Sequence, residues 1–325
     1  MELYPLKFTP ILKEKVWGGQ RLRSIYGKHQ GHLQNIGESW EISGYEGCVS
    51  VVSNGYLAGN QLDELIEVYM GELVGDSVYD RFGLEFPLLF KLIDADENLS
   101  IQVHPNDEVA GAYNAMGKTE MWVVLHAEPG AKIVAGFKKQ TDKSALARSV
   151  ENGGLCDFLC DIEVHAGDVI FVPAGRIHSI CKGVMVAEIQ QNSDLTFRLY
   201  DYDRIDATGK KRDLHVEQAL EAIDYAATPN PVTHPDEKMN GATNLVQCSY
   251  FTTNMICFNR TIQRDYALLD SFVTYICTEG AFEVETRGGK ALVNKGESVL
   301  IPNSLEQVTL RPKQRVARLI ETYVN

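Results

Sequence analysis

The sequence predicts an all-β fold with inserted helices, and three observations support this prediction. Short strand-like runs, each bounded by Gly, Pro, Asn or Asp, recur along most of the chain. Only three segments place apolar residues at helical spacing. A proline-rich segment without periodicity, at residues 228–235, separates a long N-terminal part from a second strand-rich part. We therefore expect two domains, residues 1–235 and residues 236–325.

The individual elements follow from local patterns. An Asp/Glu-rich start favours the first helical segment, and Thr141 is a suitable N-cap for the second. The third places Val216, Ala219, Leu220 and Ile223 on one face. The clearest strands are expected at Pro87–Ile93, Trp122–Leu125, Val169–Val172 and Val184–Ile189, and the helices at Leu57–Tyr69, Thr141–Val150 and His215–Tyr225.

Composition and charge restrict the class of protein. The chain has 325 residues, 44% of them hydrophobic, and this is enough for two cores of ordinary size. The net charge of −13 argues against a nucleic acid or an anionic membrane as partner. It leaves a phosphorylated small molecule open, because a few local cations can hold one phosphate. We find no signal peptide and no apolar run that could span a bilayer. Seven cysteines without a Cys-x2-Cys pair suggest free thiols, so we expect a cytoplasmic protein.

Four polar residues occupy positions that suit one metal site. In the strictly alternating run 100–104, the side chains of Ser100, Gln102 and His104 share one face. Glu120 lies in a second strand-like run, and His178 follows the turn signal Pro-Ala-Gly at 173–175. If these segments are neighbours, two imidazoles, a carboxylate and an amide oxygen converge around one divalent metal, with room for substrate or water.

Each of these residues also has an ordinary structural explanation. A histidine before a proline can end a strand, a glutamine can face solvent, a lone glutamate can pair with a surface cation, and a histidine can cap a turn. The metal site is therefore predicted from the four residues together and from none of them alone.

The motifs around these residues resemble a known family. The spacing Gly-x5-Pro-x-Gly-x2-His at 167–178 and the Gln-x-His at 102–104 followed by Glu120 resemble the two cupin motifs. The wider set resembles the type I mannose-6-phosphate isomerases, in their short bacterial form: Val16–Gly19, Gly37–Glu41, Ser100–Pro105, Gly117–Trp122, Pro173–His178 and Gln190–Arg198. The resemblance runs over nearly the whole chain.

The resemblance implies a fold, a cofactor and a reaction. The expected fold consists of two cupin (jelly-roll) barrels, of which the first carries the metal site. The expected cofactor is one Zn²⁺ per chain, with Gln102, His104, Glu120 and His178 as ligands. The reaction would interconvert mannose 6-phosphate and fructose 6-phosphate through an enediol, so the partner would be a small sugar phosphate.

Two cations are candidates for catalysis. Lys118 shares the parity of Glu120, so it can act as a base, polarise an oxygen or hold phosphate. Arg198, four residues after Asp194 as in the family, can bind phosphate or stabilise the enediolate. Ser100 and Asp194 complete the expected substrate-binding residues, with Lys118 and Arg198. A surface lysine and a structural Arg–Asp pair are the alternatives.

The C-terminal part echoes the first. Residues 295–302 align with residues 166–173, with Gly on Gly, acid on acid and Pro on Pro, which indicates a repeat. In this alignment Gln307 occupies the place of His178, and the second copy has no His-x-His or Gln-x-His. We therefore expect no catalytic metal there, although Gly-Glu-x4-Pro can also be a common turn and strand.

Two other functions fit part of this evidence. Two histidines and a carboxylate also suit a cupin dioxygenase with Fe(II), and a non-catalytic sugar-binding bicupin would share the fold. Lys118 and Arg198 favour a phosphate ester over the first, and an intact ligand set argues against the second. Mn, Fe or Co can also replace zinc, since selectivity often follows availability.

Overall fold

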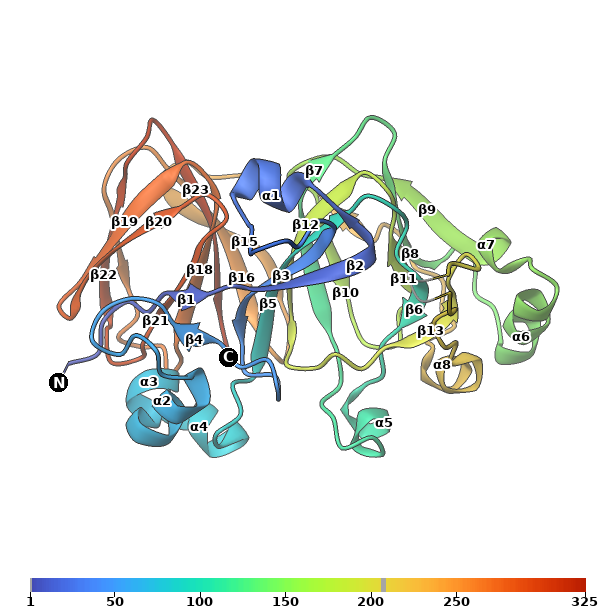
Figure 1. Cartoon of the computed structure of the whole chain (residues 1–325), viewed down its shortest axis with the longest axis horizontal. Coiled ribbons are helices and arrows are strands. Elements are labelled where there is room, and N and C mark those ends of the chain that lie inside the picture. The colour runs from blue at the N-terminus through green and yellow to red at the C-terminus, as the bar shows by residue number, and fades with distance from the viewer. Residues whose placement is uncertain (1, 206–208) are drawn as a thin grey trace. The chain divides into compact units, whose positions relative to one another are not determined.

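The structure is a computed structural model that describes residues 2–205 and 209–325. Within these residues it is mostly β, with 23 strands and eight helices (Figure 1). By their contacts the residues form two compact units. The first unit comprises residues 12–39 and 91–234, and the second comprises residues 2–11, 40–90 and 235–325. Among the described residues, no helix is both long and apolar enough to cross a bilayer.

Two sheets carry most of the first unit. In the larger one β7 runs antiparallel to both β10 and β12. Its seven strands, in spatial order, are β14 (Val232–Thr233), β10 (Val169–Val172), β7 (Glu120–Ala127), β12 (Val184–Gln191), β5 (Leu88–Ala95), β2 (Ile11–Gly19) and β3 (Ile36–Ser43). The five strands of the other are β13 (Phe197–Tyr200), β6 (Ile101–Val103), β11 (His178–Ile180), β8 (Lys132–Phe137) and β9 (Leu159–Glu163).

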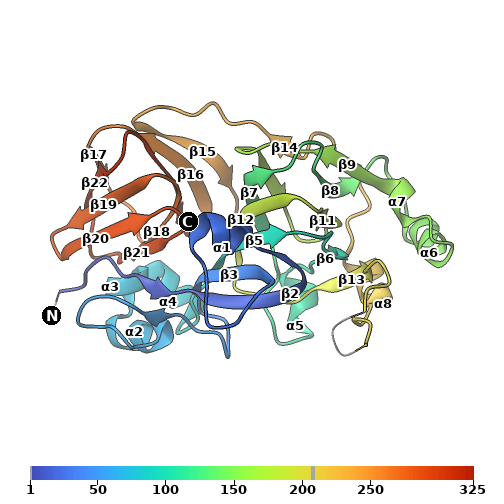
Figure 2. The same ribbon diagram turned by 45° about the horizontal axis from the view of Figure 1, so that its top comes forward.

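The second unit is also built from sheets, and its C-terminal strands lie together in both views (Figure 1; Figure 2). One sheet orders β15 (Gly241–Gln247), β16 (Thr252–Phe258), β23 (Ala317–Tyr323), β18 (Val273–Glu279) and β21 (Ser298–Ile301). Another orders β17 (Ile262–Asp265), β22 (Gln307–Pro312), β19 (Ala281–Thr286) and β20 (Gly289–Asn294). A third pairs β1 (Phe8–Thr9) with β4 (Val51–Val52).

The helices are short, and most of them were not expected from the sequence. They are α1 (Arg21–Tyr26), α2 (Leu62–Tyr69), α3 (Gly71–Val74), α4 (Asp76–Phe82), α5 (Asp107–Gly111), α6 (Lys143–Glu151), α7 (Leu155–Phe158) and α8 (Val216–Ala222). Only α2, α6 and α8 match predicted helices. The other five have four to seven residues and show little of the helical period, whereas the seven-residue α8 was recognised from apolar residues that continue the period beyond its end, to Ile223.

Two local predictions need correction. The cap of α6 is Asp142 and not Thr141, since the Asp142 carboxylate accepts a hydrogen bond from the backbone N–H of Ala145 at 2.9 Å. The proline-rich segment is not wholly irregular, because Val232 and Thr233 form β14 and pair with β10. All seven cysteines are free thiols, as expected.

The grouping of residues 40–90 with the C-terminal strands was not anticipated. The reason is a set of backbone hydrogen bonds far apart in sequence: Phe272 N–H donates to Val74 at 3.0 Å, and Asn303 N–H donates to Leu73 at 2.9 Å. A division of the chain at residue 235 into independently folding domains stays a prediction.

Alternation along the strands decides which side chains face the space between the two sheets of the first unit. Ile101 and Val103 of β6 pack outward with Leu146 of α6 and Leu220 of α8 in one apolar cluster. The side chain between them, Gln102, therefore takes the opposite face. Figure 1 and Figure 2 show α6, α7 and α8 beside this sheet. A second cluster, which includes Trp17, Ile93, Trp122, Ile133, Ile170, Ile180 and Val186, fills the space between the sheets.

The two aligned segments have the same local structure. Strand β10 occupies 169–172 and β21 occupies 298–301, at equal positions in the alignment, and β11 and β22 begin at His178 and Gln307. The glycine before each strand, Gly167 or Gly296, has a φ of +98° or +82°, a conformation that L side chains rarely adopt. A strand–turn–strand pattern therefore recurs in both units.

Candidate metal centre and substrate pocket

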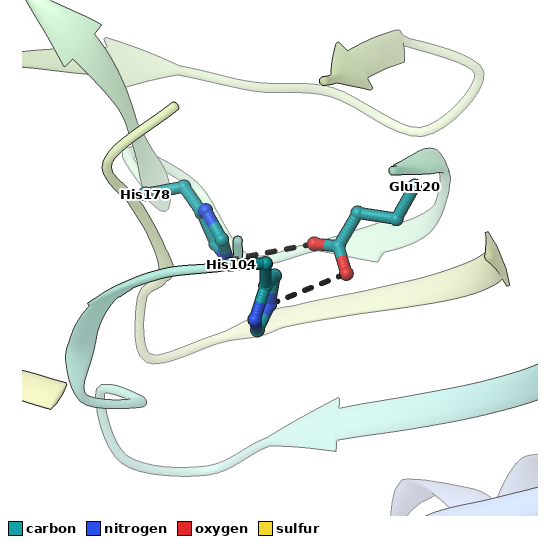
Figure 3. Close-up of side chains that lie close together, drawn as sticks. All are labelled: His104, Glu120 and His178. Atoms are coloured by element: carbon teal, nitrogen blue, oxygen red, sulfur yellow. Dashed lines mark ion pairs between the residues drawn. The ribbon is translucent and has the colours of Figure 1, made fainter. Parts of the chain in front are cut away.

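Three of the predicted ligands converge between the two sheets of the first unit. His104 follows β6, Glu120 begins β7 and His178 begins β11. One ligand atom from each lies within 4.8 Å of the others, and all three residues are at most 1% exposed. Figure 3 shows the Glu120 carboxylate pointing at both imidazole rings. Among the described residues, these three form the one group of His, Cys, Asp or Glu side chains that lie close enough together to hold a metal ion.

The hydrogen bonds of the rings leave their lone pairs facing this carboxylate. Nδ1 of His104 lies 2.9 Å from the carbonyl oxygen of Leu195, and Nδ1 of His178 lies 2.8 Å from that of Arg176. Because a carbonyl only accepts, Nδ1 carries the proton in each neutral ring and Nε2 is left as an acceptor. This arrangement, with the outer ring nitrogen bonded to the protein, is typical of metal-binding histidines.

The inner atoms of the site have unmet hydrogen-bonding capacity. Nε2 of His178 lies 3.4 Å from Oε1 of Glu120, and Nε2 of His104 lies 3.5 Å from Oε2. Among the described residues, Nε2 of His104 and both Glu120 oxygens are buried without a hydrogen-bond partner. Lys118 Nζ is 3.2 Å from Oε2, but not in hydrogen-bonding geometry. Buried acceptors that face one another in this way fit a cation between them.

Burial keeps both histidines in the neutral form that binds metals. It lowers the pKa of His178 to about 4, and the nearby ammonium of Lys118 acts in the same direction. Burial, the Lys118 ammonium and the His178 ring together hold the pKa of His104 well below its ordinary value. At neutral pH both rings are therefore already neutral, and a metal can bind at Nε2 without displacing a proton from either histidine.

Gln102 lies at the centre of a row of three polar residues across one sheet. It pairs directly with His178 on β11 and with Arg198 on β13. Its Oε1 accepts a hydrogen bond from Ser100 Oγ at 2.8 Å, and its Nε2 lies 3.5 Å from His178 Nε2. Oxygen and nitrogen of an amide are assigned from such contacts, and a half-turn of the amide directs the oxygen toward His178.

A pocket with a cavity volume of about 80 Å³ lies beside this site. Among its lining residues are the predicted Ser100, Gln102, Lys118, His178, Asp194 and Arg198. Asp194 is exposed and lies 3.8 Å from the ammonium of Lys91. Nε of Arg198 is buried and, within the described part of the chain, has no hydrogen-bond partner. Burial and the nearby Arg212 guanidinium lower the pKa of Arg198.

Several charged residues of the pocket were not singled out from the sequence. They are Lys15, Glu38, Lys91, Glu188 and Arg212. Lys91 and Glu188 are almost fully buried, and Lys91 Nζ lies 3.3 Å from Glu188 Oε1. Glu188 is the one charged residue of the apolar strand β12, and Lys91 lies within an apolar run of β5; this pattern is a signal that could have identified both. Arg212 lies outside any strand or helix and gives no such signal.

The chain is similar to known proteins over most of its length. The sequence matches the family "Phosphomannose isomerase type I, catalytic domain" over residues 5–119 and "Mannose-6-phosphate isomerase, cupin domain" over residues 241–321. It is 36% identical to the mannose-6-phosphate isomerase ManA of Bacillus subtilis over 317 residues, which cover 95% of this chain and 96% of that protein. The chain belongs to the type I phosphomannose isomerase family.

Other members of the type I phosphomannose isomerase family support the assignment over the full length. A mannose-6-phosphate isomerase of Streptococcus mutans is 35% identical over 93% of both chains. Among solved structures, a mannose 6-phosphate isomerase from Bacillus subtilis superposes with a TM-score of 0.86 at 33% identity, covering 99% of this chain and all of the other.

In this type I phosphomannose isomerase, the buried histidines predict a pH-dependent stability of the metal-free protein. The pKa of His178 is about 4 when folded and about 6.5 when unfolded. The unfolded chain therefore binds more protons between these values, and stability is lost as the pH falls from about 6.5 toward 4. From pH 7 to pH 4.5, His178 should cost about 2–3 kcal/mol of unfolding free energy. Denaturant titrations of metal-free wild type and His178→Gln at about pH 7 and about pH 4.5 measure this loss of unfolding free energy. The variant should lose less than wild type, and equal losses in the two proteins would contradict the prediction.

Proposed function

We propose that this protein is a zinc-dependent mannose-6-phosphate isomerase that acts through an enediol intermediate. One observation carries the proposal. Among the described residues, a buried His–Glu–His cluster has unmet acceptors, and the buried Nε of Arg198, on the far side of β6 from His178, has no hydrogen-bond partner; His178 and Arg198 line the same pocket. The cluster suits a divalent cation and the arginine suits an anion. A phosphorylated sugar needs both.

Gln102, His104, Glu120 and His178 would hold the metal. When bound, the ion would act as a Lewis acid for the carbonyl and adjacent hydroxyl oxygens of the open-chain sugar. Glutamine is an unusual zinc ligand, but Gln102 lies beside His178 in the sheet, and after a half-turn of its amide the oxygen would face the metal while Ser100 Oγ could accept from Nε2. The low pKa of both histidines favours metal binding, because protons compete poorly for Nε2.

Lys118 is assigned to proton transfer at the substrate oxygens. Its ammonium is buried, lines the pocket and lies 3.2 Å from Glu120. In this place its ammonium can give a proton to O1 while a base in the pocket takes the proton from C2, which forms the enediol. The resulting amine can then take the hydroxyl proton from O2 while the base returns a proton to C1, which forms the ketose. The ion pair with Glu120 holds the side chain at the reacting end of the sugar.

Arg198 is assigned to the phosphate. Strands β13 and β11 are separated by β6, so their backbones are about 10 Å apart. This separation suits an extended hexose phosphate with its carbonyl near His178 and its phosphate near Arg198. Ser100, at the same face as Gln102, and Asp194, at the pocket edge, are assigned to contacts with substrate hydroxyl groups.

We also propose that the fold consists of two cupin barrels. The recurrence of the strand–turn–strand pattern supports two cupin barrels, with one catalytic site in the first. In the second copy Val273 pairs with Ile301, as Glu120 pairs with Val172, and Gln307 occupies the place of His178. Neither a valine nor this exposed glutamine supplies the ligand of the first copy, so we assign one metal per chain.

An assay of the purified, metal-depleted protein tests the function. Zinc should restore interconversion of mannose 6-phosphate and fructose 6-phosphate, with about one ion bound per chain, and Mn²⁺, Fe²⁺ and Co²⁺ are to be compared. In D₂O, solvent deuterium should appear at C1 or C2 of the recovered sugar phosphate, because an enediol exchanges its proton. Full activity without metal would refute the metal dependence, and complete absence of isomerisation with every metal would refute the function.

A further inference from the structure

A second guanidinium lies in the same pocket as Arg198. Arg212 lines the pocket, and its side chain is 26% exposed. It follows β13 at some distance in sequence and belongs to the same compact unit. The function proposed above gives it no role, and no sequence motif pointed to it.

Asp201 orients this guanidinium. Its carboxylate accepts two hydrogen bonds from Arg212, one from Nε at 2.7 Å to Oδ2 and one from Nη2 to Oδ1. Two parallel contacts of this kind hold an arginine in both position and plane. The Nε–Nη2 edge is then occupied, and the N–H groups that point away from Asp201 are the two of Nη1 and the second one of Nη2.

Asp201 is itself held in place. Its side chain is only 6% exposed. Arg204 donates from Nη2 to Oδ1 at 2.5 Å, and its Nη1 donates to the backbone oxygen of Asn98, in the segment that leads to Ser100. The carboxylate is thus tied to the strand that carries Gln102. The Asp201 carboxylate is shared by two arginines, so it does not neutralise both, while Asp194 and Asp213 are the other carboxylates near the Arg198 guanidinium.

We propose that Arg212, oriented by Asp201, is a second phosphate-binding residue that acts with Arg198; this inference rests on the proposed function. Arg198 and Arg212 lie close enough for their charges to oppose one another, and a phosphate dianion between them relieves this repulsion. A phosphate presents three terminal oxygens, more than one guanidinium edge can bind. Asp201 is a positioning residue in this arrangement, since it touches Arg212 and not the substrate.

Binding of mannitol 6-phosphate to the metal-loaded protein tests the proposal without turnover, because this reduced sugar cannot isomerise. Calorimetry should show that Arg212→Met raises its dissociation constant about tenfold, the scale of one partly exposed charged contact. Asp201→Asn should raise it about threefold, with KM for mannose 6-phosphate rising in parallel and kcat little changed. Arg148→Met, which removes an exposed guanidinium from α6 outside the pocket, is the matched control and should change neither.

The outcomes separate this inference from the function. If wild type isomerises mannose 6-phosphate but Arg212→Met leaves both constants unchanged, Arg212 does not bind phosphate. If Arg212 governs binding of mannitol 6-phosphate but no isomerisation occurs, the anion site stands and the proposed function fails. Should Arg212→Met not fold, Arg212→Lys replaces it: the point charge remains but the two-point hold by Asp201 is lost, so about threefold weaker binding supports the inference and unchanged binding overturns it.

Discussion

Replacing His104 or His178 by alanine is expected to remove the metal and to abolish isomerisation. Each ring supplies an Nε2 that faces the Glu120 carboxylate at 3.4–3.5 Å, and each is fixed by a backbone carbonyl at Nδ1. Loss of such an outer hydrogen bond alone typically costs about 10–100-fold in metal affinity or activity, and loss of the ligand atom itself should cost more. Elemental analysis of the purified variants should fall from about one metal per chain to near zero.

A matched histidine variant controls for general effects. His165→Ala changes an exposed histidine of the same unit, between β9 and β10, and should keep both metal and activity. The second unit of the two ligand variants should still fold, as monitored by far-ultraviolet circular dichroism and thermal melting. Stoichiometric metal and normal turnover in either ligand variant would show that the metal is bound elsewhere.

Removing either pocket cation, by Lys118→Met or Arg198→Met, is expected to lower kcat/KM by about one to two decades. A charge-assisted hydrogen bond to a substrate contributes about 1.5–3 kcal/mol. The two variants should differ in how the loss is divided. Arg198→Met should mainly raise KM, since Arg198 is assigned to the phosphate. Lys118→Met should mainly lower kcat, since Lys118 is assigned to proton transfer beside Glu120.

Metal content and melting temperature decide whether these losses concern the substrate or the fold. Both variants should keep about one metal per chain and melt close to wild type. Lys132→Met, at an exposed position of β8, is the matched control for loss of a lysine. Normal isomerisation by either pocket variant would exclude that residue from the site, and loss of activity together with loss of folding would assign it to structure.

Much of the candidate site was predictable because the information is local. Alternation within one strand places Ser100, Gln102 and His104 on one face, and it needs no knowledge of neighbouring strands. The turn at Pro173–Gly175 likewise predicts where a new strand begins, and β11 does begin at His178. The long strands β5, β7, β10 and β12 were found for the same reason, since their apolar runs are continuous.

Other features depend on contacts between distant segments, which no local pattern encodes. Gln102 acquires His178 and Arg198 as neighbours only through the pairing of β6 with β11 and β13. Lys91 and Glu188 are charged residues within mostly apolar strands, and only the fold shows that they meet.

Sequence by itself therefore determined the β-rich class, the family and the three side chains His104, Glu120 and His178 that meet in the candidate metal site, because strand periodicity and motif spacing are properties of short segments. Tertiary structure alone decided that residues 40–90 group with the C-terminal strands and that Asp201 holds Arg212 at the pocket. Both depend on hydrogen bonds that the folded chain brings within reach: Phe272 to Val74, across almost 200 residues, and Arg212 to Asp201, which belong to no common helix or strand.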